Sequence, residues 1–131
     1  MELPWRSTEV WCRKGRAYCE EGQYDRAVEC YDRAIRLNAG AADAWYHKGL
    51  ALTAAGRHQE AAGCLDQATR IDPASARSWC ARGQALYNLR QYQEAAECCS
   101  QAVKLAPDSA DAWLTRGHAF RSMGRTPDAI G

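Results

Sequence analysis

A tryptophan recurs every 34 residues along most of this 131-residue chain. A fixed step held by several residue types indicates a repeated structural unit rather than chance composition. A unit of this size cannot bury an apolar face alone, so successive units are expected to stack and share a core. The residues that keep the step are Trp11, Trp45, Trp79 and Trp113; Gly15, Gly49, Gly83 and Gly117; Ala17, Ala51, Ala85 and Ala119; and Ala27, Ala61, Ala95 and Ala129.

Each unit has the pattern of two helices separated by a short break. In the second unit Trp45, Gly49 and Leu52 follow at steps of four and three, which places them on one helical face. Gly56 interrupts the pattern, and a second apolar face runs through residues 59–71. Each unit is therefore predicted to be a helical hairpin.

Proline and serine mark the boundaries between units. Pro73 ends the second helix of its unit, because the residue before a proline is disfavoured in the α conformation. Ser7, Ser75 and Ser109 occupy the position before a first helix, where a hydroxyl can cap the backbone N–H groups. Ala41 stands at the same position in the second unit, so that helix is predicted to lack a side-chain cap.

The apolar composition fits this reading. The chain has 25 alanines but only 16 residues in total of Val, Ile, Leu and Phe. Alanine is the strongest helix former and allows helices to approach closely, whereas the shortage of β-branched residues disfavours a sheet. We therefore predict an all-α fold.

Charge and hydropathy exclude several classes of protein. A formal net charge of +1 removes the electrostatic basis for general nucleic-acid binding. No apolar run approaches the roughly 18 residues of a membrane span, and residues 1–7 lack the apolar segment of a signal peptide. We expect a cytoplasmic protein with no nucleic-acid or membrane partner.

The titratable residues do not form the pattern of a catalytic or metal centre. The seven cysteines contain no Cys-x-x-Cys pair, and we expect them to be reduced thiols. His47, His58 and His118 lack the short spacings to cysteine that zinc sites use. No glycine-rich phosphate loop or nucleophile–base pair is recognisable. We expect no enzyme activity, no catalytic residue, no metal and no cofactor.

The repeated pattern resembles the tetratricopeptide repeat (TPR). The second unit carries the characteristic Trp45, Gly49 and Pro73; the first has Asn38 where an Asp-Pro pair would begin, and the third has Cys99 at a bulky core position. The resemblance implies a right-handed superhelical stack of antiparallel helix hairpins, a TPR solenoid. We expect a lead-in at residues 1–7, repeats at 8–41, 42–75 and 76–109, and a partial fourth repeat at 110–131.

The resemblance also implies a binding site. TPR proteins bind partners in a concave groove lined by the first helix of each repeat, and we expect a peptide or helix of a partner protein there. The groove is predicted to have an arginine-bearing end and an aromatic middle, residue types that dominate interface energies. Its expected residues are Arg13, Arg16, Tyr46, His47, Leu50, Arg77, Cys80, Gln84, Tyr87 and Asn88.

Binding of a chaperone tail is not expected. TPR domains of that class grip a C-terminal carboxylate with Lys and Asn at the fifth and ninth positions of one repeat and Asn at the sixth position of the next. Here those positions hold Cys12, Arg16 and His47, and only Arg77 matches a basic position in the third repeat.

A basic residue also precedes each repeated glycine. Such a ladder could bind a phosphate or an acidic partner, but its angle on the helix points away from the groove. We expect the long stems to cover apolar surface while the charges reach its rim. The residues are Lys14, Lys48, Arg82 and Arg116.

The fourth unit stops early in its second helix, whereas TPR arrays usually end with a polar helix. We therefore expect a fragment of a longer array that self-associates as a homo-oligomer through Trp113, Phe120 and Ile130 at an open C-terminal end. Two alternatives to an interaction module stay open: a regulatory or docking segment of a larger enzyme, and a self-associating scaffold.

Overall fold

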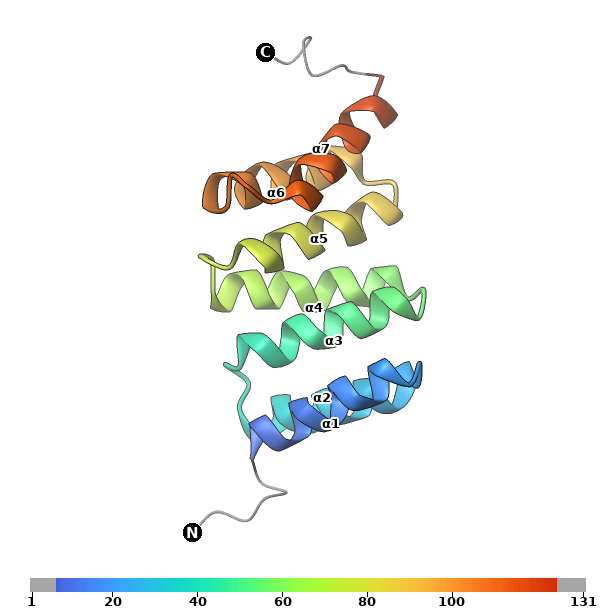
Figure 1. The fold of residues 1–131 in the computed structure, drawn as a ribbon, viewed down its shortest axis with the longest axis vertical. Helices are drawn as coiled ribbons and strands as arrows, with labels where there is room; N and C mark the ends of the chain where they lie inside the picture. Colours follow the sequence, from blue (N-terminus) through green and yellow to red (C-terminus); the bar gives the residue numbers. More distant parts are fainter. Residues whose placement is uncertain (1–6, 125–131) are drawn as a thin grey trace.

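The computed structural model describes residues 7–124, which form seven α-helices arranged as a stack of hairpins (Figure 1). The described residues contain no strand, so the predicted all-α fold is confirmed. None of these helices is long and apolar enough to cross a membrane. Their bounds are α1 Thr8–Glu20, α2 Tyr24–Leu37, α3 Ala42–Ala54, α4 His58–Ile71, α5 Ala76–Asn88, α6 Tyr92–Leu105 and α7 Ala110–Ser122.

Consecutive helices pack against each other along the whole stack. Helices α1 and α2, α3 and α4, and α5 and α6 form antiparallel hairpins, and α2, α4 and α6 each pack on the first helix of the next repeat. The chain therefore builds one quasi-linear core in which every hairpin contacts its neighbours, as expected for a solenoid. Helices α1 and α7 lie at opposite ends of the stack (Figure 1).

The repeated glycines lie where the two helices of a hairpin approach most closely. A Cβ added at Gly15 would lie 2.6 Å from the Tyr31 ring, and one added at Gly49 would lie 2.6 Å from Leu65 Cγ. In the third repeat a Cβ at Gly83 would lie 2.5 Å from the Cys99 sulfur. One small residue thus faces one large or polarisable residue in each of these hairpins. This pairing explains how the core can be closely packed although the chain has few large aliphatic residues.

The repeated tryptophans connect each repeat to the turn before it. The indole Nε1–H of Trp45 donates to the Ala39 carbonyl at 2.9 Å, and that of Trp79 donates to Pro73 at 2.9 Å. Trp113 does the same with the carbonyl six residues earlier, at 2.7 Å. A buried indole usually finds such an acceptor. The tryptophan ladder therefore fixes the inter-repeat turns as well as filling space.

The serine caps are confirmed in two of the three predicted places. Ser75 accepts a hydrogen bond from the backbone N–H of Ser78, and Ser109 accepts one from Ala112. Ser7 also precedes a helix, but its side chain makes no capping bond, so that prediction was wrong. Helix α3 begins after Ala41 without a side-chain cap, as predicted.

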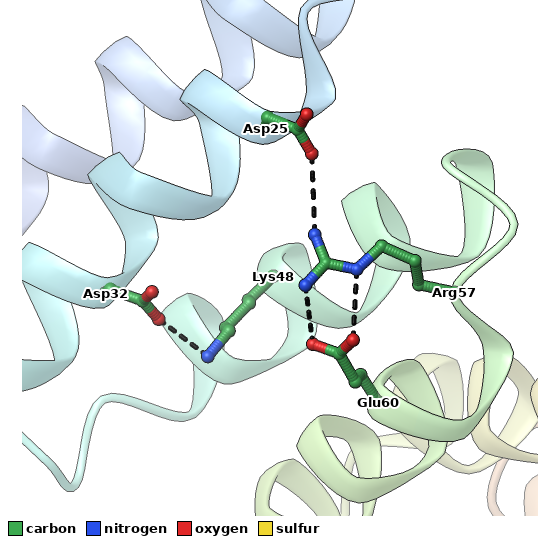
Figure 2. Close-up of polar contacts among 5 residues, drawn as sticks. All are labelled: Asp25, Asp32, Lys48, Arg57 and Glu60. Atoms are coloured by element: carbon green, nitrogen blue, oxygen red, sulfur yellow. Dashed lines mark hydrogen bonds and ion pairs between the residues drawn. The ribbon is translucent and has the colours of Figure 1, made fainter.

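The basic ladder lies against the tryptophans, away from the groove, and its two middle members, Lys48 and Arg82, are also ion-paired. Figure 2 shows Lys48 of α3 reaching Asp32 of α2, with 2.6 Å between Nζ and the carboxylate. Arg82 pairs with Asp66 of α4 at 3.1 Å. Lys48 and Arg82 also lie 5.8 and 5.4 Å from the ring centres of their neighbouring tryptophans. The predicted covering of apolar surface is confirmed for these two residues, while their partner acids across the first two repeat junctions were missed.

A second contact across the first junction involves Arg57. Its guanidinium forms two hydrogen bonds with Glu60, at 3.0 and 2.7 Å, and reaches Asp25 of α2 at 3.4 Å (Figure 2). These groups are exposed, so their contribution to the free energy of unfolding is small.

The turn between the two helices of each repeat needs one left-handed residue. Gly22, Gly56 and Gly124 have φ of 76°, 81° and 74°, and Arg90 holds the same place in the third repeat with φ of 64°. The following backbone N–H, that of Gln91, bonds back to Leu86 at 2.9 Å and closes the helix end. An arginine is strained in this conformation because its Cβ crowds the backbone.

Replacing Arg90 with glycine is expected to stabilise the protein by about 1 kcal/mol, because it relieves that strain. Urea unfolding followed by circular dichroism measures the change. The converse substitution Gly56→Arg serves as control and should cost a similar amount. An unchanged or lowered midpoint for Arg90→Gly contradicts the prediction.

Candidate peptide-binding groove

The first helices of the repeats form the inner side of the stack. Helix α1 contacts α3, α3 contacts α5 and α5 contacts α7, whereas successive second helices contact each other less. The side where helices lie closer together must be the concave one. Helices α1, α3, α5 and α7 therefore line the groove, as the sequence resemblance implied.

A hollow of about 630 Å³ opens on this side between α1 and α3. Cys12 and Arg16 project into it from α1, and Asp43 and His47 from α3. A second hollow, where Leu50 is 37% exposed, shares Arg16 and His47 with the first. The two hollows thus form one continuous surface, which we name the N-terminal groove. Its other lining residues are Thr8, Glu9, Cys19, Glu20, Tyr24, Tyr31, Ala41, Ala42, Ala44, Ala51 and Ala54.

Two of the predicted arginines are already paired. Arg77 reaches Asp43 in the preceding repeat at 2.6 Å, and its guanidinium lies 4.3 Å from the centre of the Tyr46 ring. Arg13 lies 3.4 Å from Glu9 one turn earlier. Arg16, by contrast, forms no hydrogen bond or ion pair within residues 7–124 and is exposed. It is the groove cation best able to meet an incoming carboxylate.

His47 lies at the centre of the N-terminal groove. Its ring stacks on Tyr31 with 6.0 Å between ring centres, and the edge of Tyr46 approaches it at 5.1 Å. Partial burial, followed by the charges of Arg77 and Arg16, lowers the pKa of His47. The ring is therefore neutral at pH 7 and presents one donor and one acceptor.

The thiols of the first helices do not form a reactive site. Cys80 is only 8% exposed, so its predicted place in the groove was wrong: it packs with Ala102 and Ala112. Burial and then Asp111 raise the pKa of Cys80, and burial and then Asp43 raise that of Cys12. All seven cysteines are free, and no three His, Cys, Asp or Glu side chains in the described residues are grouped to hold a metal ion.

Tyr87, predicted for the aromatic middle of the groove, packs among other aromatic rings. Tyr87 meets the edge of Tyr92 at 5.4 Å and that of His118 at 6.1 Å between ring centres. Gln84 beside it is half-buried, and Asn88 is exposed, with its amide 3.4 Å from His58. The contact between Tyr87 and His118 depends on how α5 and α7 pack.

Two of the three residues expected to mediate self-association lie in the described part of the chain. Phe120 is 7% exposed and lies under Arg116, 4.8 Å from its guanidinium, so it is unavailable to a second copy and that assignment was wrong. Trp113 is 48% exposed. Ile130 lies outside the described residues.

Comparison with known families agrees with the repeat pattern and the geometry. Two sequence profiles, each described as a tetratricopeptide repeat, match residues 12–76 and 76–109, which together span well over half of the chain. The chain belongs to the tetratricopeptide repeat family. A comparison with curated proteins gives no significant match.

Solved TPR domains have the same fold. The TPR domain of Arabidopsis OM64 is 27% identical, with 91% of this chain and 98% of that chain covered and a TM-score of 0.85. The first TPR of Spaghetti (RPAP3), bound to the HSP90 peptide SRMEEVD, is 19% identical, covering 90% and 94% with a TM-score of 0.88. The second TPR domain of human RPAP3, in complex with the HSP70 peptide SGPTIEEVD, is 23% identical, covering 86% and 98% with a TM-score of 0.81.

Proposed function

We propose that this TPR protein is an interaction module that binds a peptide or helix of a partner protein in its concave groove. The observation that carries the proposal is the N-terminal groove, in which the unpaired Arg16 stands beside the neutral His47. The groove adjoins apolar surface at Leu50, so it offers both a charge contact and an apolar contact.

The chemistry of the groove favours a segment with a carboxylate next to an apolar side chain. A carboxylate at Arg16 would form a charge-assisted hydrogen bond, and the His47 N–H could donate a second one. An apolar side chain would bury Leu50 and Ala54. That two domains of the same fold carry bound peptides supports a peptide ligand for this groove.

A chaperone tail is a poorer fit than an acidic–apolar segment of another sequence. Of the three positions that would hold a terminal carboxylate, only Arg16 carries a positive charge, because Cys12 stands where chaperone-binding domains carry lysine and His47 is neutral. Arg77 is already engaged by Asp43. The EEVD peptides therefore serve as reference ligands in the test.

Reversing the charge at Arg16 tests the proposal. Peptides are selected on the wild-type chain from a random display library, and their affinities are measured by isothermal titration calorimetry. Arg16→Glu is expected to weaken binding about tenfold or more, because hydrogen bonds to charged groups contribute about 1.5–3 kcal/mol. Arg13→Glu should have a smaller effect, since Glu9 already engages Arg13.

Arg36→Glu is the matched control, because Arg36 is exposed on α2 and does not line the N-terminal groove. It should leave affinity unchanged, and all three variants should keep the wild-type unfolding midpoint to within the small effects of surface charges. Peptides that bind wild type and Arg16→Glu equally would show that the groove assignment is wrong. Preferential binding of the EEVD peptides would show that the proposed ligand sequence is wrong.

A further inference from the structure

The first helix carries a face that is buried in every later repeat. Ala51, Ala85 and Ala119 are 0% exposed where the first helix of each later repeat packs on the preceding hairpin. Ala17 has the same register in α1 and is exposed. Val10 and Lys14 lie on the same side of α1, at steps of four and three. This face has the composition of a packing surface.

This face also carries the basic member of the acid–base pair that joins neighbouring repeats. Lys48 pairs with Asp32 of α2 at 2.6 Å, and Arg82 pairs with Asp66 of α4 at 3.1 Å (the first pair is drawn in Figure 2). Lys14 occupies the same register in α1 and forms no ion pair within residues 7–124. The first two junctions thus place an acid on one helix against a base on the next, and Lys14 supplies only the base.

A cleft between α1 and α2 extends this basic surface. Trp11 and Tyr18 form its aromatic wall, and α2 lines it with two arginines, Arg26 and Arg33, together with Cys30 and one acid, Glu29. The Arg33 guanidinium lies 4.9 Å from the centre of the Trp11 ring, and that of Arg26 lies 5.9 Å from that of Tyr18. Neither arginine forms an ion pair within the described residues, so both can accept carboxylates while resting on the rings.

We propose that this end of the stack binds an acidic helix of a partner protein. The end face, defined as Val10, Lys14 and Ala17 with the adjoining arginine cleft, receives the helix as α3 receives α2. A carboxylate of the partner pairs with Lys14, small and apolar residues pack on Val10 and Ala17, and further acids meet the arginines. The end face is distinct from the N-terminal groove, whose lining residues do not include Lys14 or Ala17.

Charge complementarity favours this occupant over a second copy of the chain. The acids at the matching register, Asp32 and Asp66, are already paired within the stack. The next position in that register is Ser100, which accepts a hydrogen bond from Arg116 at 2.9 Å. The described part of another copy therefore offers no free acid in this register, whereas an acidic helix from a different protein can.

A peptide that copies α2 tests the end face directly, because α2 already presents Asp32 to a lysine of the same register. The probe is a labelled peptide of residues 24–37. Because a free helix of this length is marginally stable in water, Arg33→Lys is introduced and its side chain is joined to Glu29 by a lactam that holds the helix. Its binding to the full chain is followed by fluorescence anisotropy. Lys14→Asp is expected to weaken binding about tenfold. Peptide Asp32→Lys should bind the Lys14→Asp chain with near wild-type affinity.

Two further variants define the surface. Lys104→Asp, exposed on α6, is the matched charge control and should leave binding unchanged. Ala17→Arg should block the helix sterically while leaving the stability of the chain intact, because Ala17 is exposed. Arg16→Glu should bind the α2 peptide normally, so failure of the groove and failure of the end face are separable.

Three results would overturn the proposal. The first is no saturable binding of the α2 peptide, or no rescue by the charge swap. The second is self-association of the chain that increases with concentration in sedimentation velocity and is abolished by Lys14→Asp. That result would mean that a second copy of the chain occupies the end face. The third is a lowered free energy of unfolding for Lys14→Asp and Ala17→Arg together with unchanged peptide affinity. That result would mean that the chain's own residues cover the end face.

Discussion

Replacing Gly49 with alanine is expected to destabilise the protein by about 1–3 kcal/mol, although alanine is the better helix former. The new Cβ would lie 2.6 Å from Leu65 Cγ and 2.8 Å from its Cδ2, and Leu65 is fully buried. Leu65 can therefore not move aside without disturbing the core. The free energy of unfolding from urea denaturation, followed by circular dichroism, measures the loss.

Gly63, in the partner helix α4, is the matched control. It is exposed, and a Cβ there would meet nothing within 4 Å, so Gly63→Ala should stabilise by about 1 kcal/mol through helix propensity alone. Combining Gly49→Ala with Leu65→Ala should cost less than the sum of the two single changes, because the added methyl enters the space that Leu65 leaves. A stabilising Gly49→Ala would show that the hairpin does not need its close approach.

Replacing Tyr31 with alanine is expected to have the largest effect on stability, about 3–5 kcal/mol. Its ring is 1% exposed, fills the space above Gly15 in the first hairpin, and supports the His47 ring at the centre of the groove. The cavity would uncouple the first hairpin from the rest, because stability in a repeat stack depends on nearest-neighbour contacts. Urea unfolding is expected to show an earlier transition, with groove affinity lost in the folded fraction.

Tyr31→Phe separates the ring from its hydroxyl. Burial is the main reason that the pKa of Tyr31 is raised, so the hydroxyl stays neutral and its loss should cost only about 0.5–1.5 kcal/mol. The phenylalanine ring should still support His47 and keep groove affinity. If Tyr31→Ala and Tyr31→Phe lost equal amounts of stability, the hydroxyl rather than the packed ring would be the important group.

Most of the fold followed from periodicity. The step of 34 residues predicted the hairpins, and the second apolar face of the second repeat, at residues 59–71, lies within one residue of the observed bounds of α4. These features depend on contacts within a repeat or between neighbours, which a repeated sequence encodes directly. The failure at Ser7 is of another kind: a favourable residue at a helix start permits a capping bond without requiring it.

The candidate groove was predictable only in outline. Helical angle placed Arg16 and His47 on the inner side, and both line the N-terminal groove. The same angle placed Cys80 there too, yet Cys80 is buried against the neighbouring hairpin. The angular position of a residue around one helix does not show how much of that helix the adjacent repeat covers.

The sequence alone therefore determined the repeat and its all-α hairpins, because these depend on residue type at fixed local spacing, whereas the face expected to form the groove came from the resemblance to the TPR family. The tertiary structure decided which charges are free. Arg77 is paired with Asp43 from 34 positions earlier, while Arg16 and Lys14 have no ion-pair partner in residues 7–124. Long charged side chains pair according to how neighbouring helices are spaced and inclined, and these relations arise only when the repeats are stacked.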